Sequence, residues 1–323
     1  MLRLISTFIM ALVLSTSNAV ADEGLGNYPD KPITFVVSFG PGGGTDIVAR
    51  LIAAELGERI GQPVVVENKP GASGILAAQY VARSKADGYT LLIGGSGPMV
   101  FNTLIYNSLP YDPFEDFEAV TILGSYPIVL VANNDQPFDT LEEMITYAKE
   151  NPGELNYGSA GASFQVPTEY FASEADIEMT LIPYKGTAEA SQALMAGELQ
   201  LVSADLGPVA SLLNSGKVKG LAVTTKERNP ILPDVPSVTE FGFDDFDVSL
   251  YSAVAAPKGT PEAITQYLQR ELHEVLHSDK VVAQLEKLGI TPEGMPTEEA
   301  LERYRYEADL FRPIVEEMGL QVD

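Results

Sequence analysis

The stretch Ile33-Thr-Phe-Val-Val-Ser-Phe-Gly-Pro-Gly-Gly-Gly-Thr-Asp46 joins a short apolar run to a turn with three consecutive glycines. Residues 33–37 are typical of a buried parallel strand, and the apolar residues of 47–56 recur at helical spacing. The stretch therefore predicts a strand–turn–helix unit, in which Thr45 or Asp46 can cap the helix. Glycine permits positive φ and lets a ligand approach the backbone, so we expect a side chain at Gly43 to block an anion or to distort the turn.

Free N–H groups at the start of a helix form an anion-binding site without any positive side chain. A tight turn that binds nothing fits this stretch equally well. Two nucleotide-binding motifs are excluded. A Walker A loop ends in Gly-Lys-Ser/Thr, whereas this turn ends in Gly44-Thr45-Asp46, and a dinucleotide fingerprint needs a third glycine where Thr45 stands.

Length and composition favour a two-domain globular protein, with 323 residues of which 45% are hydrophobic. The chain has 20 Lys and Arg against 45 Asp and Glu, a net charge of −25, which excludes general binding to nucleic acid or anionic membranes. Three readings of this charge remain open: a cationic partner, an anion site built from backbone dipoles, or simply a solvated acidic surface. With no cysteine in the chain, a disulfide is impossible.

Residues 1–21 resemble a secretory signal peptide. Arg3 supplies the positive charge, residues 4–14 the apolar core, and Ala19-Val20-Ala21 a small-x-small cleavage site. The core is too short to span a bilayer comfortably. We therefore expect the mature protein to be soluble and exported to a bacterial periplasm.

Strand, small-residue loop and helix alternate along the chain after the first glycine turn. Strand-like residues 64–67 precede a Gly-rich loop at 70–74, and residues 89–93 precede a Gly/Ser loop at 94–98. Such units in series predict a parallel sheet covered on both faces, with ligands beyond the carboxyl ends of its strands.

The second half of the chain repeats this architecture. Two strand-like runs, 120–123 and 128–132, flank a crossing near residues 125–127, and the extended run 246–256 can bring the chain back before a helical tail. Further small-residue loops follow strand-like runs at 158–163, 183–187 and 204–208. Two sheets joined by two crossings predict a hinge and a cleft lined by loops of both halves.

Eight short stretches resemble, in order, the solute-binding receptors of tripartite tricarboxylate transporters, the Bug or TctC-like family. They are Tyr28-Pro-Asp-Lys-Pro-Ile33, Pro41-Gly-Gly-Gly-Thr-Asp46, Val64-Val-Val-Glu-Asn-Lys-Pro-Gly71, Asp87-Gly-Tyr-Thr-Leu-Leu92, Leu109-Pro-Tyr-Asp-Pro113, Tyr157-Gly-Ser-Ala-Gly161, Pro183-Tyr-Lys-Gly186 and Leu232-Pro-Asp-Val-Pro-Ser237. Each stretch is weak evidence alone, but eight in the family's order are highly specific.

The resemblance implies a type II-like periplasmic-binding-protein fold of two α/β domains, with the ligand cleft between them and two crossover strands as hinge. Residues 28–126 and 251–323 would form domain 1, and residues 127–250 domain 2. It further implies a receptor, not an enzyme, that binds a small organic carboxylate and presents it to membrane permease subunits. We expect no cofactor, metal, catalytic residue or nucleic acid, and a monomer.

Ligand contact is carried over from the family to the glycine turn and to small-residue loops of both domains. The residues are Phe39, Pro41, Gly42, Gly43, Gly44, Thr45, Asp46, Ser96, Asn102, Ser159, Ala160, Gly161, Ser163, Lys185, Gly186 and Asp205. The loop at 158–165 departs from the family pattern, with Ala162-Ser163-Phe164-Gln165 where a Gly-Thr-Ser-Ser-like run is usual. Phe164 and Gln165 could therefore alter the distal part of the pocket.

The sequence leaves more than one role open for each of three charged residues. Asp46 can cap its helix, orient the glycine loop, or face a ligand amine or hydroxyl. Asp205 can shape its loop or meet the ligand, and Lys185 can contact the ligand or form a salt bridge across the hinge.

The sequence His273-Glu-Val-Leu-His277 matches the H-E-x-x-H motif of zinc proteases and places both histidines on one helix face. A secreted hydrolase or metalloprotease is therefore the competing class, although the motif lies outside the predicted cleft and lacks a compelling third ligand. The other reading is an exposed helix face with two histidines. A scaffold or adhesion protein would use repeats or exposed binding surfaces, and the sequence shows neither.

Overall fold

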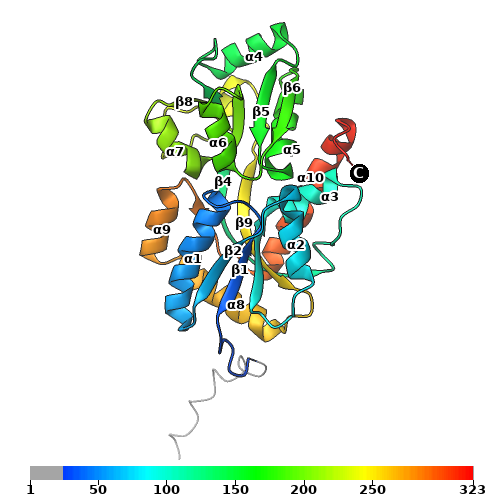
Figure 1. Cartoon of the computed structure of the whole chain (residues 1–323), viewed down its shortest axis with the longest axis vertical. Coiled ribbons are helices and arrows are strands. Elements are labelled where there is room, and N and C mark those ends of the chain that lie inside the picture. Colours follow the sequence, from blue (N-terminus) through cyan, green and yellow to red (C-terminus); the bar gives the residue numbers. More distant parts are fainter. Residues whose placement is uncertain (1–24, 323) are drawn as a thin grey trace, which may run out of the picture.

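The computed structural model describes residues 25–322, so the predicted signal peptide lies outside the described residues. Figure 1 shows two lobes stacked along the long axis. The first lobe contains β1 (Ile33–Val37), β2 (Val64–Asn68) and β3 (Thr90–Gly95), which pair in parallel, and the short β10 (Thr291–Pro292). Its helices are α1 (Gly44–Ile60), η1 (Ala72–Gly74), α2 (Ile75–Ala82), η2 (Gly97–Phe101), α3 (Asn102–Ile105), α8 (Glu262–Leu276), α9 (Asp279–Glu286) and α10 (Thr297–Glu317).

The second lobe repeats the strand–helix pattern. Its strands are β5 (Leu155–Ser159), β6 (Met179–Pro183), β7 (Leu201–Asp205) and β8 (Val218–Val223). Its helices are α4 (Leu141–Glu150), α5 (Ala162–Glu174), α6 (Thr187–Met195), α7 (Leu206–Asn214) and η3 (Val238–Phe241). The N-cap residue of α4 is Thr140, whose side-chain oxygen accepts a hydrogen bond from the backbone N–H of Glu143.

Two long antiparallel strands, β4 (Phe117–Asn133) and β9 (Ser249–Pro257), connect the lobes (Figure 1). The strand order is β2-β1-β3-β9-β4-β7-β5-β6, so β9 and β4 form the centre of the sheet. The prediction of two separate strand-like runs, 120–123 and 128–132, is wrong, because both runs belong to the single strand β4. Pairing with β9 continues through Pro127, opposite Ser249, and small register shifts absorb the irregular residues.

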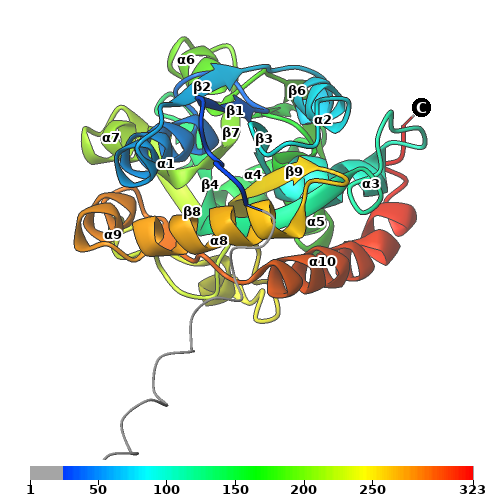
Figure 2. The same ribbon diagram turned by 90° about the horizontal axis from the view of Figure 1, so that it is seen from below.

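Helices cover both faces of the first lobe's sheet. The right-handed crossovers β1–α1–β2 and β2–α2–β3 run in opposite directions along the sheet and therefore place α1 and α2 on opposite faces. Figures 1 and 2 both show the two helices on opposite sides of β1, and α1 packs against α8. This arrangement leaves the carboxyl ends of β1 and β3 directed at the second lobe (Figure 1).

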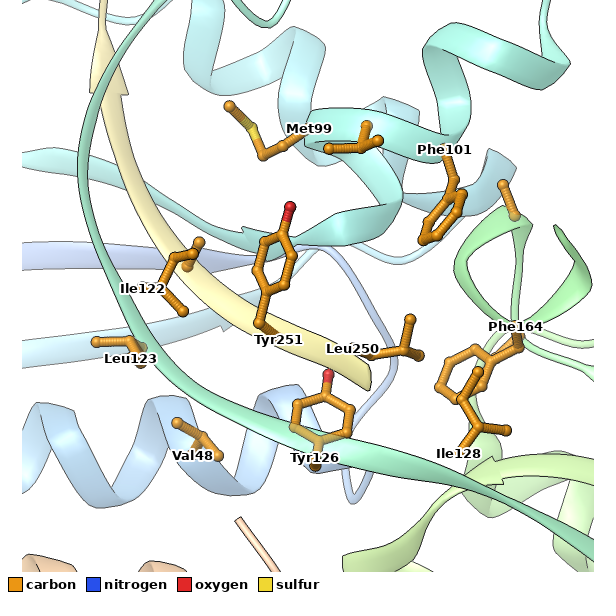
Figure 3. Packing of buried hydrophobic residues seen from close by; sticks show 14 of the residues in the cluster. Val48, Met99, Phe101, Ile122, Leu123, Tyr126, Ile128, Phe164, Leu250 and Tyr251 are labelled. Atoms are coloured by element: carbon orange, nitrogen blue, oxygen red, sulfur yellow. The ribbon is translucent and has the colours of Figure 1, made fainter. Parts of the chain in front are cut away.

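The buried core continues from the first lobe through the connecting strands. Tyr126 of β4, Leu250 and Tyr251 of β9 and Phe164 of α5 belong to one buried cluster (Figure 3). Each of these four side chains is at most 6% exposed. Burial of this kind, at about 25 cal/mol per Å² of apolar surface, stabilises the connection between the lobes.

A partly buried polar network joins α10 to the connecting strands. The Arg303 guanidinium lies 2.9 Å from Glu293 Oε1 and 3.1 Å from Glu307 Oε1, and 4.6 Å above the ring of Tyr251. Tyr251 stacks on Tyr304 with ring centroids 5.7 Å apart. Within the described chain, the Tyr251 and Tyr304 hydroxyls and Glu307 Oε2 are buried without a hydrogen-bond partner. Burial, only partly opposed by Arg303, raises the pKa of Glu307 to about 7.

Candidate functional site

The β1–α1 turn is shaped by Asp46 from inside the helix rather than by a capping side chain. The N-cap is Gly43, with no side-chain cap. Asp46, in the first turn of α1, accepts a hydrogen bond of 2.9 Å from the N–H of Gly42 and one of 2.8 Å from the side chain of Asn68. Burial opposes ionisation, but these donors and Arg50 hold the pKa of Asp46 below its usual value. Of the roles left open for Asp46, orienting the loop is the one this geometry favours.

Of the three consecutive glycines in the β1–α1 turn, Gly42 has positive φ and Gly43 does not. Gly42 has φ +82°, whereas Gly43 has φ −78°, which other residues also adopt. A Cβ at Gly43 would meet only the carbonyl oxygen of Gly40, at an ordinary 3.7 Å. The expectation that a side chain at Gly43 distorts the turn is therefore wrong.

The Asp205 carboxylate lies against the starts of two helices that are not its own. It is 3% exposed and ends β7, directly before α7, yet it does not cap α7. It accepts hydrogen bonds from the N–H of Gly44 at the start of α1 and from the hydroxyl of Thr187 at the start of α6. Burial raises the pKa of this carboxyl, while the two donors oppose the shift. The N–H group of Gly44, which we expected to face a ligand, therefore donates to the Asp205 carboxylate of the other lobe.

Backbone contacts bring the loops of the two lobes together around this carboxylate. The N–H of Gly40 donates to the carbonyl oxygen of Lys185 at 3.4 Å. A Cβ at Gly161 would lie 3.1 Å from Cα of Ser73, so this position needs the small residue that it has. The lobes are therefore closed on each other in the structure.

A small inner cavity remains between the closed lobes. Its volume is about 20 Å³, which is room for about one water-sized group. Hydroxyl-bearing and small residues of both lobes and of the connecting strands form its wall, which includes no Lys, Arg or His within the described chain. The lining residues are Phe39, Gly43, Gly44, Thr45, Gly95, Ser96, Gly97, Tyr126, Ala160, Ser163, Phe164, Gly186, Thr187, Asp205 and Tyr251.

A larger outer cavity of about 330 Å³ adjoins the inner one. Phe39 and Ala160 line both cavities and so mark the boundary between them. Lys185 and Glu189 are the charged residues of its wall. The lining residues are Phe39, Gly71, Ala72, Ser73, Gly74, Tyr106, Ala160, Gly161, Pro183, Tyr184, Lys185 and Glu189.

The loop 71–74, which forms one wall of the outer cavity, has an unusual backbone. All four residues have positive φ, including Ala72 at 46° and Ser73 at 54°. Such conformations cost about 1–3 kcal/mol each outside glycine and need support from their surroundings. Asn102 donates to the carbonyl oxygen of Ser73 at 3.0 Å, and the hydroxyls of Ser73 and Tyr106 lie 2.9 Å apart. Buried Asn102 therefore holds the loop 71–74, which forms this wall, in its conformation.

The structure brings most of the predicted ligand-binding residues to the two cavities. Those at the inner cavity are Phe39, Gly43, Gly44, Thr45, Ser96, Ala160, Ser163, Gly186 and Asp205, and the outer cavity adds Gly161 and Lys185. Those that line neither cavity are Pro41, Gly42, Asp46, Asn102 and Ser159. Ser159 instead hydrogen-bonds the carbonyl oxygen of Gly161 at 3.2 Å, so it supports the loop from within.

Several lining residues were not predicted. Tyr126 and Tyr251 come from the connecting strands, where a tyrosine in an apolar run reads as core. Thr187 follows Gly186 at the start of α6, and this small-residue loop was the signal that could have identified it. The Gly-rich loop 70–74 was recognised in the sequence but was not assigned to the site.

The H-E-x-x-H motif lies at the C-terminal end of α8, with His273 in the last turn and His277 as the C-cap residue. Nδ1 of His273 lies 2.9 Å from the carbonyl oxygen of Gly294, and Nδ1 of His277 lies 2.8 Å from that of His273. Among residues 25–322 no group of three His, Cys, Asp or Glu side chains is placed to hold a metal ion. Nor does this part of the chain include a helix with the length and apolar character of a membrane span.

Comparison with known proteins gives concordant matches over nearly the whole chain. A family model described as "Tripartite tricarboxylate transporter family receptor" matches residues 48–320. Protein BugT of Bordetella pertussis is 35% identical over 287 residues, 88% of this chain and 88% of BugT.

Two solved structures from Rhodopseudomonas palustris are similar in fold and sequence. Rpa4515 with adipate has a TM-score of 0.88 and 34% identity, and the match covers 91% of this chain and 99% of that one. MatC with bound malate has a TM-score of 0.85 and 32% identity, covering 89% and 100%. Similarity to periplasmic binding proteins confirms the predicted α/β fold class.

Proposed function

Since the chain belongs to the tripartite tricarboxylate transporter receptor family, as its motifs predicted, we propose that it is a periplasmic receptor that captures a small organic carboxylate. The family consists of substrate-binding proteins, not enzymes. The observation that carries the proposal is the inner cavity, enclosed by loops of both lobes and lined by hydroxyl groups and helix starts. Such donors stabilise a carboxylate without a cationic side chain.

The proposed ligand class, a small organic carboxylate, rests on the residues that line the inner cavity. In our proposal one carboxylate of the ligand accepts hydrogen bonds from Ser96 and Ser163 and from backbone N–H groups of the turn that ends at Thr45, apart from that of Gly44, which donates to Asp205. Adipate and malate, the ligands named for the two similar structures, are dicarboxylates and support this class. Asp46, Asn102 and Ser159 then act as supports that hold the binding groups in place.

In our proposal the receptor is an exported, two-domain monomer. Residues 1–21 direct export and are removed, and the mature protein is a monomer. It divides into domain 1 (28–126 and 251–323) and domain 2 (127–250), which close on the ligand about β4 and β9. The loaded receptor delivers its acid to the permease subunits of a tripartite tricarboxylate transporter.

A panel of mono-, di- and tricarboxylates, each paired with its uncharged amide, tests the proposal by thermal shift and calorimetry. A ligand bound only by the folded state raises the melting temperature, and 100-fold excess over Kd adds about 2.7 kcal/mol. We expect at least one acid to stabilise the protein and its amide to fail. Stabilisation by no acid, or equally by the amides, would refute the proposal.

The variant Ser163→Ala tests whether the acid binds in the inner cavity. Ser163 is 3% exposed and lines this cavity, whereas Ser173 is exposed near the other end of the same helix, α5. Loss of one hydrogen bond to a charged group, about 1.5–3 kcal/mol, should weaken acid binding at least tenfold in Ser163→Ala. The control Ser173→Ala should bind as the wild type does.

A further inference from the structure

A partly buried charge cluster contacts the two connecting strands at the place where they line the inner cavity. Ser125 of β4 is paired with Tyr251 of β9, and the Arg303 guanidinium of α10 reaches both, 3.2 Å from the Ser125 hydroxyl and 4.6 Å from the centroid of the Tyr251 ring. Tyr251 lines the inner cavity, as does Tyr126, the residue after Ser125 (Figure 3). The cluster and the cavity therefore share the same short segments of the connecting strands.

The cluster contains two carboxylates and one cation. Arg303 pairs with both Glu293 and Glu307, and neither carboxylate forms an ion pair with another residue of the described chain. The side chains of Glu293 and Glu307 are only 15% and 12% exposed, so water solvates them poorly. With both carboxylates ionised, the cluster carries one uncompensated negative charge. Burial of such a charge is costly, and a carboxyl group avoids the cost by binding a proton.

Glu307 is the carboxyl group of the cluster that is suited to hold this proton. Glu293 accepts hydrogen bonds from Arg303 at both of its oxygens, 2.9 and 3.1 Å away, and a further one from the Ser125 hydroxyl. Glu307 accepts one from Arg303 at Oε1, whereas its Oε2 is buried without a hydrogen-bond partner among residues 25–322. The Tyr251 hydroxyl is buried and unpartnered in the same cluster, and it can accept a hydrogen bond from a protonated carboxyl group.

From this geometry we propose that Glu307 is a proton-binding site coupled to the capture of an anion in the inner cavity. The inference rests on the proposed function, because the coupling needs a carboxylate in that cavity. The bound carboxylate and Glu307 both adjoin Tyr251, and the protein interior screens the repulsion between two negative charges only weakly. An ionised Glu307 therefore weakens binding, and by reciprocity a bound anion draws a proton onto Glu307. The receptor takes up the acid and a proton together.

Calorimetry in two buffers of different heats of ionisation counts the protons taken up on binding. The probe is the acid of the panel described above that binds the wild type most tightly, with adipate and malate tried first. We expect affinity to fall about fivefold between about pH 6 and about pH 9, the order that two like charges across one layer of side chains produce. By linkage, this fall corresponds to uptake of about a third of a proton near pH 7.4. Glu307→Gln should bind the probe at every pH and lose both effects.

Two further variants separate this coupling from other sources of protons. Glu302→Gln removes an exposed carboxylate of the same helix and should behave as the wild type does. Glu293→Gln leaves Arg303 to Glu307 alone, so Glu307 should ionise more readily and proton uptake should move to lower pH. This variant keeps Glu307 itself, so it tests the coupling even if Glu307→Gln fails to fold. Protons of the probe and of distant groups are common to all variants and cancel in the differences.

The outcomes separate the two proposals. If the probe binds but the wild type takes up no proton, or if the uptake persists in Glu307→Gln, the proton site is refuted and the proposed function stands. Loss of binding at every pH in a folded Glu307→Gln variant would also refute it, because a neutral side chain should favour the anion. If no acid binds to the wild type, the proposed function fails and the coupling fails with it.

Discussion

Replacing Glu307 by glutamine is expected to remove a pH dependence that this buried carboxyl group imposes on folding stability. Burial raises its pKa from 4.5 to about 7. Between these two pH values the folded protein keeps a proton that the unfolded chain has released, so the free energy of unfolding falls as pH rises through this window. At about 1.4 kcal/mol per pKa unit, this contribution is about 3 kcal/mol smaller above pH 7 than below pH 4.5.

Urea denaturation from about pH 4 to about pH 8.5 measures this contribution as the difference between the variant and the wild type. The Glu307→Gln variant should gain about 3 kcal/mol relative to the wild type across the series, because glutamine is neutral throughout while Arg303 keeps its partner Glu293. The control is Glu302→Gln, an exposed residue of the same helix, for which we expect a flat difference. A flat difference for Glu307→Gln as well would refute the reasoning.

Two further predictions concern the closed cleft. A Cβ at Gly44 would overlap the Asp205 carboxylate, so Gly44→Ala should keep the lobes apart and give the ligand-free protein a larger radius of gyration than Gly43→Ala. Identical scattering profiles of the two variants would contradict this contact. Monocarboxylate affinity should stay constant or rise modestly with an inert salt, because no cationic side chain lines the inner cavity within residues 25–322 and salt screens the net charge of −25. A steep loss of affinity, measured by calorimetry over a salt series, would point to a cationic cluster at the ligand.

The local architecture could be predicted because short-range patterns determine it. The apolar run 33–37 is β1 as predicted, and the helix predicted at 47–56 is the middle of α1. The continuity of β4 could not be predicted, since Gly124 and Pro127 are typical of a break. They are tolerated because β9 and β10 pair with this segment from distant parts of the chain.

The site could be predicted only as far as single loops. Family motifs identified the loops that meet at the cavities, but not which groups of those loops face each other. The hydrogen bond between Gly44 and Asp205 joins residues 161 positions apart, and no periodicity or spacing encodes such a pairing. Tyr126 and Tyr251 were missed for a related reason: their strands are buried, as core strands are, and the cavity that the two residues line is completed by loops of both lobes.

The central place of β9 in the sheet has a consequence for the order of folding. This strand, Ser249–Pro257, is inserted between β3 and β4, both of which are made much earlier in the chain. Until it arrives, β3 and β4 have unpaired edges that invite pairing with other chains, and the contacts that complete them close a long loop, which is slow. A chain cut before β9 therefore lacks the middle of its first lobe. We therefore expect the lobe that is synthesised first to finish folding last.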